Sequence, residues 1–581
     1  MQDDTKWTKP GPGTWELDTA HFAPECSQII RDLMEAALPQ GMQEGFALVG
    51  GPISGMDCRF VHGRFYRRLI PAVGANSDRP PPPAIVLWLA SRLVPTLRRT
   101  DQTASKALSE KIWLTELERW EAEWKPALIA RSRELGRVSP ADLDDEALAD
   151  HIEQLHDHLH HGTVLHFRLH ASDLGPIGLL LVRGADMGLT AREMMDTLAG
   201  SSPATSAPSM AIGRLAQMVH EHDEIPTTVD ELRALSPRVA EAFDEFIAEF
   251  GWRLTTGYDL RDTTLAETLE LVVSAITNRQ TSRGPVDEAA RTAGAVARDQ
   301  LLAKVAAADR DELASLIDDG RATYGLRDEN GPITFQWPAG LLRRAILEAA
   351  TRLERAGRLP ETTQNAAGVN DAVFDLSADE LMALLRGDTT RSRPSVAEIE
   401  ARYRERHQRS EVSAPRFLGP EPPEPPLWAL KPSSALLMRV VLEVVELLEV
   451  TPAAGDESVA TGARSETDHG GTIVLTGVGI GSTPYEGVAR VVTDDIDALS
   501  RVNPGDVVVA PFTVPTYNAV LAMAGAVITD NGGLLCHSAV IARELGIAAI
   551  VGAGQATARI PDGATVVVDP GAGTVTVITP P

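Results

Sequence analysis

The sequence contains little cysteine, and its cysteines are widely separated. Cys26, Cys58 and Cys536 are the three cysteines among 581 residues. No two of them have the paired spacing of metal ligands, so the sequence offers no cysteine-based metal site. Such sparse cysteines fit a protein of the reducing cytoplasm.

Positive charge and long apolar runs are also scarce. Lys and Arg number 54 against 81 Asp and Glu, which gives a net charge of −27 and a field that repels nucleic acids and anionic membrane surfaces. The longest apolar runs, 84–90 and 174–182, are far shorter than the roughly 20 residues of a membrane helix. Residues 1–7 lack an apolar signal core. We therefore expect a cytoplasmic protein without nucleic-acid or membrane partners.

The length allows two to four domains. Residues 451–471 are rich in Gly, Ala, Ser, Thr and Asp without periodicity, which is typical of a flexible linker. Before this segment, apolar residues recur at helical spacing, and alternation typical of strands is scarce. We therefore predict a mainly helical substrate-binding region over 1–450, a linker over 451–471 and a third region over 472–581.

The region after the linker has a different texture. Short β-branched runs alternate there with short helical patterns such as 516–524. The expected strands cover 472–475, 488–492, 506–509, 526–528, 549–551, 565–568 and 574–578. The predicted fold class is a multidomain protein, with a mainly α-helical substrate domain and a compact C-terminal β/α domain.

One histidine of this C-terminal region lies between a glycine turn and a helix. The apolar run 522–528 ends in a predicted strand, Gly532-Gly533 permits a tight turn, and apolar residues recur at helical spacing until Gly546. His537 therefore opens a helix, where unpaired backbone N–H groups favour a phosphoryl group. Its neutral imidazole is a competent nucleophile near pH 7. A helix-capping or core histidine is the alternative interpretation.

This segment resembles the phosphohistidine domain of the phosphoenolpyruvate-utilising enzymes. The matching residues are Gly532, Gly533, Cys536, His537, Ala539, Val540, Ala542, Arg543, Glu544, Gly546, Ile547, Ala549, Val551 and Gly552. The resemblance implies a swivelling domain in which His537 accepts a phosphoryl group and passes it to a second substrate. It also implies that the phosphoryl site is supported by Gly532, Gly533, Cys536, Ser538 and Arg543. Leu535 stands where many members have threonine, and Ala548 replaces the usual proline.

Half of the 14 histidines lie in residues 151–170 of the helical region. They are His151, His156, His158, His160, His161, His166 and His170. His166 and His170 share the i, i+4 spacing of helical zinc ligands, but the catalytic glutamate of such motifs is absent. We predict no metal site here. Either these are packed or solvated histidines, or His166 or His170 lines a substrate pocket as a general base.

Blocks of the helical region also resemble the central region of family members such as rifampin phosphotransferase and phenylphosphate synthase. They are 15–21, 251–259 and 370–381. The second block implies pocket roles for Arg253 and Asp259, although Trp252 replaces the usual histidine; the alternative is an ion pair that fixes a loop. In the third, the simplest interpretation is that Phe374 and Leu376 are core residues of a short strand that enters a helix capped by Ser377.

The nucleotide-binding ATP-grasp domain of full-length relatives has no counterpart among these residues. The glycine-rich segment 477–481 is only weakly similar to a nucleotide-binding glycine loop, and it is predicted to be a turn. The resemblance therefore implies that ATP and Mg²⁺ are bound by an ATP-grasp partner subunit. The expected function is a phosphotransferase subunit that carries a phosphoryl group on His537 to a hydroxylated organic or phenolic acceptor. The alternatives are a catalytically silent binding or regulatory homologue and a lyase that acts through a phosphorylated intermediate.

Overall fold

The computed structural model divides into two compact units. It describes residues 6–19, 21–74, 82–254, 257–277, 286–361, 368–388, 390, 393–409, 413–421, 424–448, 473–493, 495–513 and 517–579. Unit 1 comprises Met1–Gly175, Trp252–Thr264 and Asn330–Arg439, and unit 2 comprises Pro176–Gly251, Leu265–Glu329 and Val440–Pro581. Each unit therefore draws on segments far apart in the sequence.

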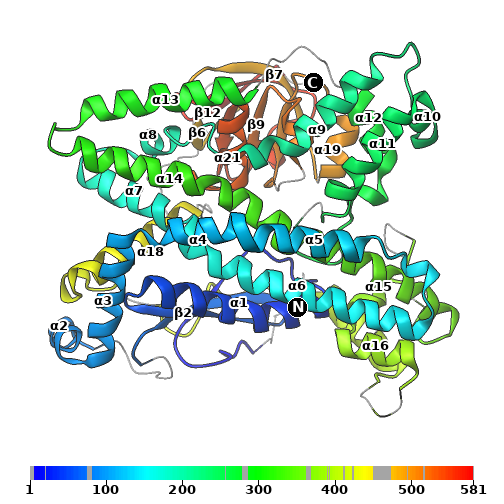
Figure 1. The fold of residues 1–581 in the computed structure, drawn as a ribbon, viewed down its shortest axis with the longest axis horizontal. Helices are drawn as coiled ribbons and strands as arrows, with labels where there is room; N and C mark the ends of the chain where they lie inside the picture. The colour runs from blue at the N-terminus through cyan, green and yellow to red at the C-terminus, as the bar shows by residue number, and fades with distance from the viewer. Residues whose placement is uncertain are drawn as a thin grey trace. The chain divides into compact units, whose positions relative to one another are not determined.

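Unit 1 is mainly helical. Its helices are α1 (Gln28–Val49), α2 (Ala84–Leu93), α3 (Pro95–Glu110), α4 (Ile112–Arg119), α5 (Lys125–Gly136), α6 (Asp145–Asp173), α15 (Trp337–Arg355), α16 (Ala378–Arg386), α17 (Val396–Gln408) and the first part, up to Arg439, of α18 (Pro432–Leu448). α1 packs along α6, and both appear in the blue to cyan part of Figure 1. A Cβ atom at Gly41 of α1 would lie 2.2 Å from the carbonyl oxygen of Val164. Only glycine therefore permits the observed closeness of these two helices.

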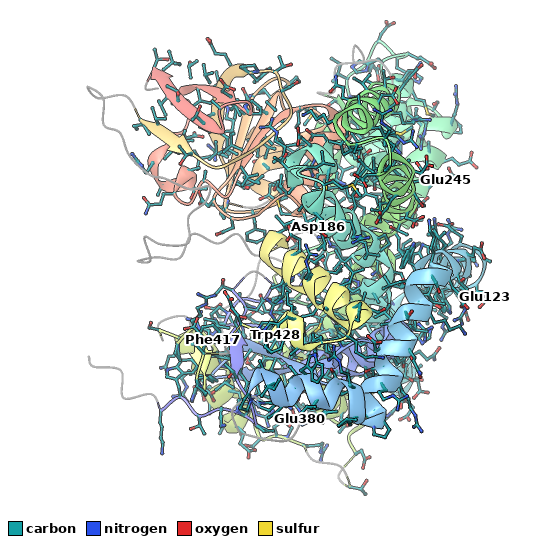
Figure 2. The ribbon with its side chains drawn as sticks, turned by 90° about the vertical axis from the view of Figure 1, so that its left-hand side faces the viewer. Glu123, Asp186, Glu245, Glu380, Phe417 and Trp428 are labelled. Carbon is teal, nitrogen blue, oxygen red and sulfur yellow. The ribbon has the colours of Figure 1, made fainter. Side chains whose placement is uncertain are left out.

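A four-stranded sheet in unit 1 is absent from the sequence predictions. Its order is β2 (Ile53–Val61), β3 (Arg64–Pro71), β1 (Trp15–Leu17) and β4 (Phe417–Leu418), with antiparallel neighbours. His62 and Gly63 both have positive φ at the turn between β2 and β3, as a two-residue hairpin requires. Phe417 of β4 is labelled in Figure 2. This sheet was therefore missed, although the region before residue 450 is largely helical, as expected.

The predicted helix over 377–385 in unit 1 is confirmed as α16. The Ser377 hydroxyl accepts from the backbone N–H of Glu380, and the Glu380 carboxylate accepts from the backbone N–H of Ser377. Glu380, labelled in Figure 2, also pairs with Arg402 at 2.7 Å. Phe374 and Leu376 are buried just before this helix, so their core position is confirmed. The short strand predicted for them was wrong, because Asp371–Asp375 form a 3-10 helix that the Asn370 side chain caps.

Unit 2 combines helices with a mixed sheet. Its helices outside the C-terminal region are α7 (Gly175–Asp186), α8 (Ala191–Asp196), α9 (Pro203–Val219), α10 (Val229–Leu235), α11 (Pro237–Phe246), α12 (Leu269–Thr277), α13 (Val286–Lys304) and α14 (Arg310–Gly331). The C-terminal helices are α19 (Asp495–Arg501), α20 (Asn518–Leu521), α21 (His537–Leu545) and α22 (Ala556–Arg559). α21 packs against α9 and α13, which are drawn in green beside the orange and red sheet in Figure 1.

The eight-stranded sheet of unit 2 has parallel strands at its centre. Its order is β5 (Val474–Thr476), β12 (Thr574–Thr579), β11 (Thr565–Asp569), β7 (Tyr485–Val491), β8 (Val507–Ala510), β9 (Ala526–Thr529), β10 (Ala548–Val551) and β6 (Val478–Ile480). The pairs β7–β8, β8–β9 and β9–β10 are parallel, and the other pairs are antiparallel. The predicted strands of this region are thus confirmed within a few residues. The turn predicted over 477–481 was wrong, because β6 fills it and pairs with β10.

The predicted fold class is confirmed, since a largely helical region precedes a C-terminal β/α region. The predicted linker 451–471 lies outside the described residues. The division at 450 and 472 stays a prediction, because packing groups the C-terminal region with α7–α14. No helix among the described residues is long and apolar enough to cross a membrane.

Candidate functional site: a histidine at a helix N-terminus

Two parallel strands of unit 2 place the candidate site at one edge of the sheet. β8 ends at Ala510 and β9 ends at Thr529. The loops after them carry Thr513 and His537. Because the carboxyl ends of adjacent parallel strands meet at one edge, these side chains converge from positions 24 residues apart.

The glycine turn and the helix have the predicted geometry. Gly532 has φ +119°, and a Cβ atom there would lie 2.7 Å from the Cys536 sulfur, so the turn requires glycine. Cys536 has the extended backbone of an N-cap residue, His537 is the first helical residue, and Gly546 ends the helix in the left-handed conformation. The prediction that His537 opens a helix is confirmed.

Hydrogen bonds hold one edge of the His537 ring. Nδ1 lies 2.9 Å from Thr513 Oγ1, which lies 2.7 Å from Ser538 Oγ. If Nδ1 carries the proton, it donates to Thr513, and Nε2 then holds the lone pair needed for nucleophilic attack. The Thr513–Ser538 pair can therefore fix the tautomer that makes Nε2 reactive.

The opposite edge of the ring is shielded from water. Nε2 is buried and has no hydrogen-bond partner within the described part of the chain. Burial, together with the nearby Arg327 guanidinium, lowers the pKa of His537 to about 3. The ring is consequently neutral at pH 7, as a nucleophile must be.

Arg327 brings a positive charge to the site from α14. Its Nη2 donates to the carbonyl oxygen of Leu535 at 2.8 Å, two residues before His537. A guanidinium here opposes an imidazolium but stabilises the negative charge of a phosphoryl group. Sequence reasoning missed Arg327 and Thr513, because neither lies in the motif around His537.

Leu535, the departure from the threonine of many relatives, is fully buried. With Leu534 and Val540 it belongs to an apolar cluster supplied mainly by helices α7, α8, α13 and α14. Only Cys536 separates these two leucines from His537. The loop that carries His537 is therefore anchored by apolar packing against the helices of the same unit.

Among the predicted supporting residues, Arg543 has a structural position. Its Nη1 donates to the Leu534 carbonyl oxygen at 2.8 Å, and its Nε lies 3.7 Å from Asp196 of α8. Gly533 and Ser538 are buried in the same turn, and burial raises the pKa of the Cys536 thiol. Arg543 thus holds the loop through its backbone, and the role of the group in a phosphoryl site stays a prediction.

Glu544, the residue after Arg543, is a buried acid with a raised pKa. Glu544 is buried and accepts from the backbone N–H of Gly200 at 3.1 Å. Burial, and then the proximity of Asp328, raise the pKa of Glu544 to about 8, although backbone N–H groups at 200–202 oppose this shift. The link between α21 and the segment before α9 therefore titrates near neutral pH.

The predicted pocket histidines lie together in unit 1, on α6. The His166 and His170 rings are 4.7 Å apart. His170 Nδ1 lies 3.3 Å from Asp173, and His166 Nδ1 lies 3.3 Å from the Thr334 hydroxyl. Burial, with a smaller contribution from His170, lowers the pKa of His166 to about 3.

The other predicted pocket residues follow α11 in the sequence but belong to unit 1. The Arg253 guanidinium lies 5.9 Å from the centre of the Trp337 ring. Asp259 accepts from the backbone N–H groups of Ser27 at 2.7 Å and Arg261 at 2.9 Å. These contacts fix a loop around Asp259, and the pocket roles of both residues stay predictions.

Among the remaining histidines of α6, two are packed, whereas His161 is exposed. His151 and His158 are buried, and His158 Nε2 lies 2.9 Å from the Ser132 hydroxyl. Over the described ranges, no group of three or more His, Cys, Asp or Glu side chains forms a candidate metal site.

Comparisons with known proteins agree with this geometry. Residues 502–573, which include His537, match the mobile domain of the PEP-utilising enzymes. Residues 179–328, which include Arg327, match the rifampicin phosphotransferase fourth domain. The chain therefore contains both domains, and the resemblance stated for the C-terminal region is confirmed.

Similar proteins include several phosphoenolpyruvate synthases. That of Escherichia coli K12 is 44% identical over 98 residues, covering 17% of this chain and 12% of that protein. That of Aeropyrum pernix is 29% identical over 204 residues, covering 32% and 24%. The Bacillus subtilis protein described as uncharacterized phosphotransferase YvkC is 38% identical over 104 residues, covering 18% and 12%. The similarity thus spans at most a quarter of these relatives' lengths.

Proposed function

We propose that this chain is a dikinase-type phosphotransferase in which His537 carries the phosphoryl group. The observation that carries the proposal is the state of the His537 ring: it opens a helix, is held neutral, and lies beside the Arg327 guanidinium. A neutral imidazole, a helix N-terminus and a fixed cation together suit the formation of a phosphoramidate. The match to the PEP-utilising mobile domain supports the same chemistry.

The hydrogen bond to Thr513 supports Nε2 as the reacting atom. With Nδ1–H donating to Thr513 Oγ1, the Nε2 lone pair attacks phosphorus while the bond from phosphorus to the donor oxygen breaks. The Nδ1 proton stays in place, so the phosphorylated ring is an imidazolium whose positive charge lies beside the negative phosphoryl oxygens and the Thr513 hydroxyl. In the second step the acceptor oxygen attacks phosphorus, and the electron pair of the P–N bond returns to Nε2.

The burial of Nε2 implies that the ring moves during this cycle. A phosphoryl group does not fit on an atom that is already enclosed by protein. We therefore propose that the observed packing of the His537 loop is the resting arrangement, and that the C-terminal region 472–581 tilts on the segment 451–471 far enough to uncover Nε2 while Arg327 of α14 stays within reach of the phosphoryl group. The apolar anchor at Leu534, Leu535 and Val540 would separate in that movement.

The proposal extends to the phosphoryl donor and the phosphoryl acceptor. ATP with Mg²⁺ would be bound by a separate ATP-grasp partner subunit, and the group transferred would be the β-phosphoryl. The acceptor would be a hydroxylated organic or phenolic compound bound in unit 1, near His166, His170, Arg253 and Asp259. The contact of His166 with Thr334 and the stacking of Arg253 on Trp337 support a shared polar and aromatic environment there.

Intact-mass measurement tests the carrier role. The full chain is incubated with ATP, Mg²⁺ and a candidate ATP-grasp partner, and we expect one acid-labile phosphoryl adduct. His537→Ala should abolish it, whereas His220→Ala, which changes an exposed histidine of unit 2, should leave it intact. An adduct that persists in His537→Ala, or no adduct with any partner, would contradict the proposal.

A further inference from the structure

Unit 1 contains a histidine that a buried carboxylate orients. His21 Nδ1 lies 2.9 Å from both carboxylate oxygens of Asp18. The Asp18 side chain is 4% exposed and the His21 side chain is 50% exposed. The Arg67 guanidinium lies 3.7 Å from the Asp18 carboxylate and helps to hold it in position. Because Nδ1 faces Asp18, the Nε2 edge of the imidazole is directed away from the carboxylate.

Aromatic rings connect His21 to the predicted pocket histidines. The His21 ring centre is 6.0 Å from that of Tyr258, which lies 5.4 Å from Phe335. Thr334, the residue before Phe335, contacts His166. Phe22 also lies 6.0 Å from Tyr258. Flat apolar rings beside a carboxylate-backed imidazole suit an aromatic ligand that carries a hydroxyl group.

The three histidines of this neighbourhood are not equivalent as bases. The pKa of His166 is lowered to about 3 by burial, so its affinity for a proton is weak. His170 packs its ring against His166 and Phe167, and its contact to Asp173 is longer, at 3.3 Å. His21 combines the shorter carboxylate contact with exposure, which a base that meets a substrate requires.

We propose that His21 is the general base that deprotonates the acceptor, and that the acceptor is a small aromatic hydroxyl compound bound beside Tyr258. Asp18 is the positioning residue that holds the His21 tautomer. This inference rests on the proposed function, because the hydroxyl is activated for transfer from phosphohistidine.

In the transfer step, a proton moves from the acceptor to His21 and a phosphoryl group moves from His537 to the acceptor. His21 Nε2 takes the proton of the acceptor hydroxyl while that oxygen forms a bond to phosphorus. The P–N bond to His537 breaks, and its electron pair returns to His537 Nε2. The imidazolium formed at His21 is stabilised by Asp18 and later releases its proton to water. No oxidant or further reactant is needed.

Acceptor acidity provides a sharp test. The chain is first charged on His537, and loss of the adduct is followed after adding phenol or a nitrophenol that is ionised at the assay pH. His21→Gln should slow transfer to phenol by roughly 10²–10⁴-fold. It should leave transfer to the ionised nitrophenol within a few-fold of the unmodified chain, because no proton remains to be removed.

A matched control is His407→Gln. His407 is 45% exposed, lies 3.9 Å from the Asp371 carboxylate and packs its ring on Tyr403 rather than on Tyr258. The variant therefore changes a second histidine–carboxylate pair. It should transfer to both phenols normally. Asp18→Asn should shift the pH profile of transfer to phenol without shifting that of transfer to the nitrophenol, a difference that a merely structural role would not produce.

The outcomes separate this inference from the proposed function. If no adduct forms on His537, the proposed function fails, and nitrophenol binding to His537→Ala then tests the aromatic site alone: weaker binding after Tyr258→Ala supports it, and unchanged binding overturns it. If the adduct forms, equal slowing of both phenols in His21→Gln, or no slowing, overturns the role as base. Failure of the charged chain to transfer to either phenol overturns the acceptor class.

Discussion

The two units place a histidine ring in opposite environments, which differ in burial and in the sign of the neighbouring charge. In unit 2, Nε2 of His537 is enclosed, a cation lies nearby, and the ring is neutral. In unit 1, His21 is half exposed and its Nδ1 lies 2.9 Å from the Asp18 carboxylate. A nucleophile that carries phosphorus must not hold a proton on the attacking atom, whereas a base must accept one. Residue type alone therefore does not assign a role; the sign of the neighbouring charge and the access of water do.

Removing the cation of unit 2 should have the largest effect on this contrast. Arg327→Met should slow phosphorylation of His537 by roughly 10²–10³-fold, because a fixed donor to the transferring phosphoryl group is lost. Time-resolved intact-mass measurement of the adduct checks this. Arg298→Met, which breaks an exposed pair with Asp318, is the matched control and should change the rate little; equal slowing in both variants would contradict the role of Arg327.

Truncating Leu535, which anchors the loop before His537, should lower the stability of unit 2. Leu535→Ala should lower the free energy of unfolding by about 2–5 kcal/mol, because a fully buried side chain leaves a cavity. Leu442→Ala, which truncates an exposed leucine, should cost far less. Denaturant titration measures both. A loss at Leu535 no greater than that at Leu442 would show that the anchor does not pack as described.

Removing the Thr513 hydroxyl, the hydrogen-bond partner of His537 Nδ1, should slow phosphorylation less than removing Arg327. Thr513→Val keeps the shape of the side chain but removes the partner of His537 Nδ1, and phosphorylation should slow roughly 10–100-fold, as for other residues that orient a reactive imidazole. ¹⁵N NMR of labelled histidine should show a shift in the tautomer ratio. An unchanged tautomer ratio would assign the fixing of the ring to other contacts.

The smallest expected effect concerns the link at Glu544. Its pKa is raised to about 8 in the folded chain, so the folded state binds a proton that the unfolded state releases above about 4.5. This contribution to stability is complete below the unfolded pKa and is lost as the pH rises through about 8. Unfolding midpoints between pH 5 and 9 should therefore fall with pH in the native chain and change less in Glu544→Gln. Parallel profiles for the two chains would exclude this role.

The parts of the fold and site that the sequence predicted rest on local signals. The helix from His537 to Gly546 follows from a glycine turn, helical spacing and a left-handed end, all within 15 residues. The C-terminal strands follow from uninterrupted β-branched runs. These signals involve neighbours in the chain, so they are visible without knowledge of the fold.

The parts that were missed depend on contacts between distant residues. Arg327 meets Leu535 across 208 positions, and Thr513 reaches His537 because two parallel strands end at the same edge. The hairpin of β2 and β3 was missed because arginines such as Arg64, Arg67 and Arg68 interrupt its apolar pattern. The sign of the charge around each histidine was equally hidden, since it depends on which side chains the fold brings together.

The close crossing of α1 and α6 limits which mutations unit 1 tolerates in evolution. α1 begins seven residues after His21, and α6 carries His166 two residues after Val164, where the Gly41 backbone makes its closest approach. Even a single added methyl at codon 41 would force the helices apart, because the obstructing atom is a backbone oxygen that cannot rotate away. A substitution at this one codon would then displace the rings near His21 and Tyr258, although none of those residues had itself changed.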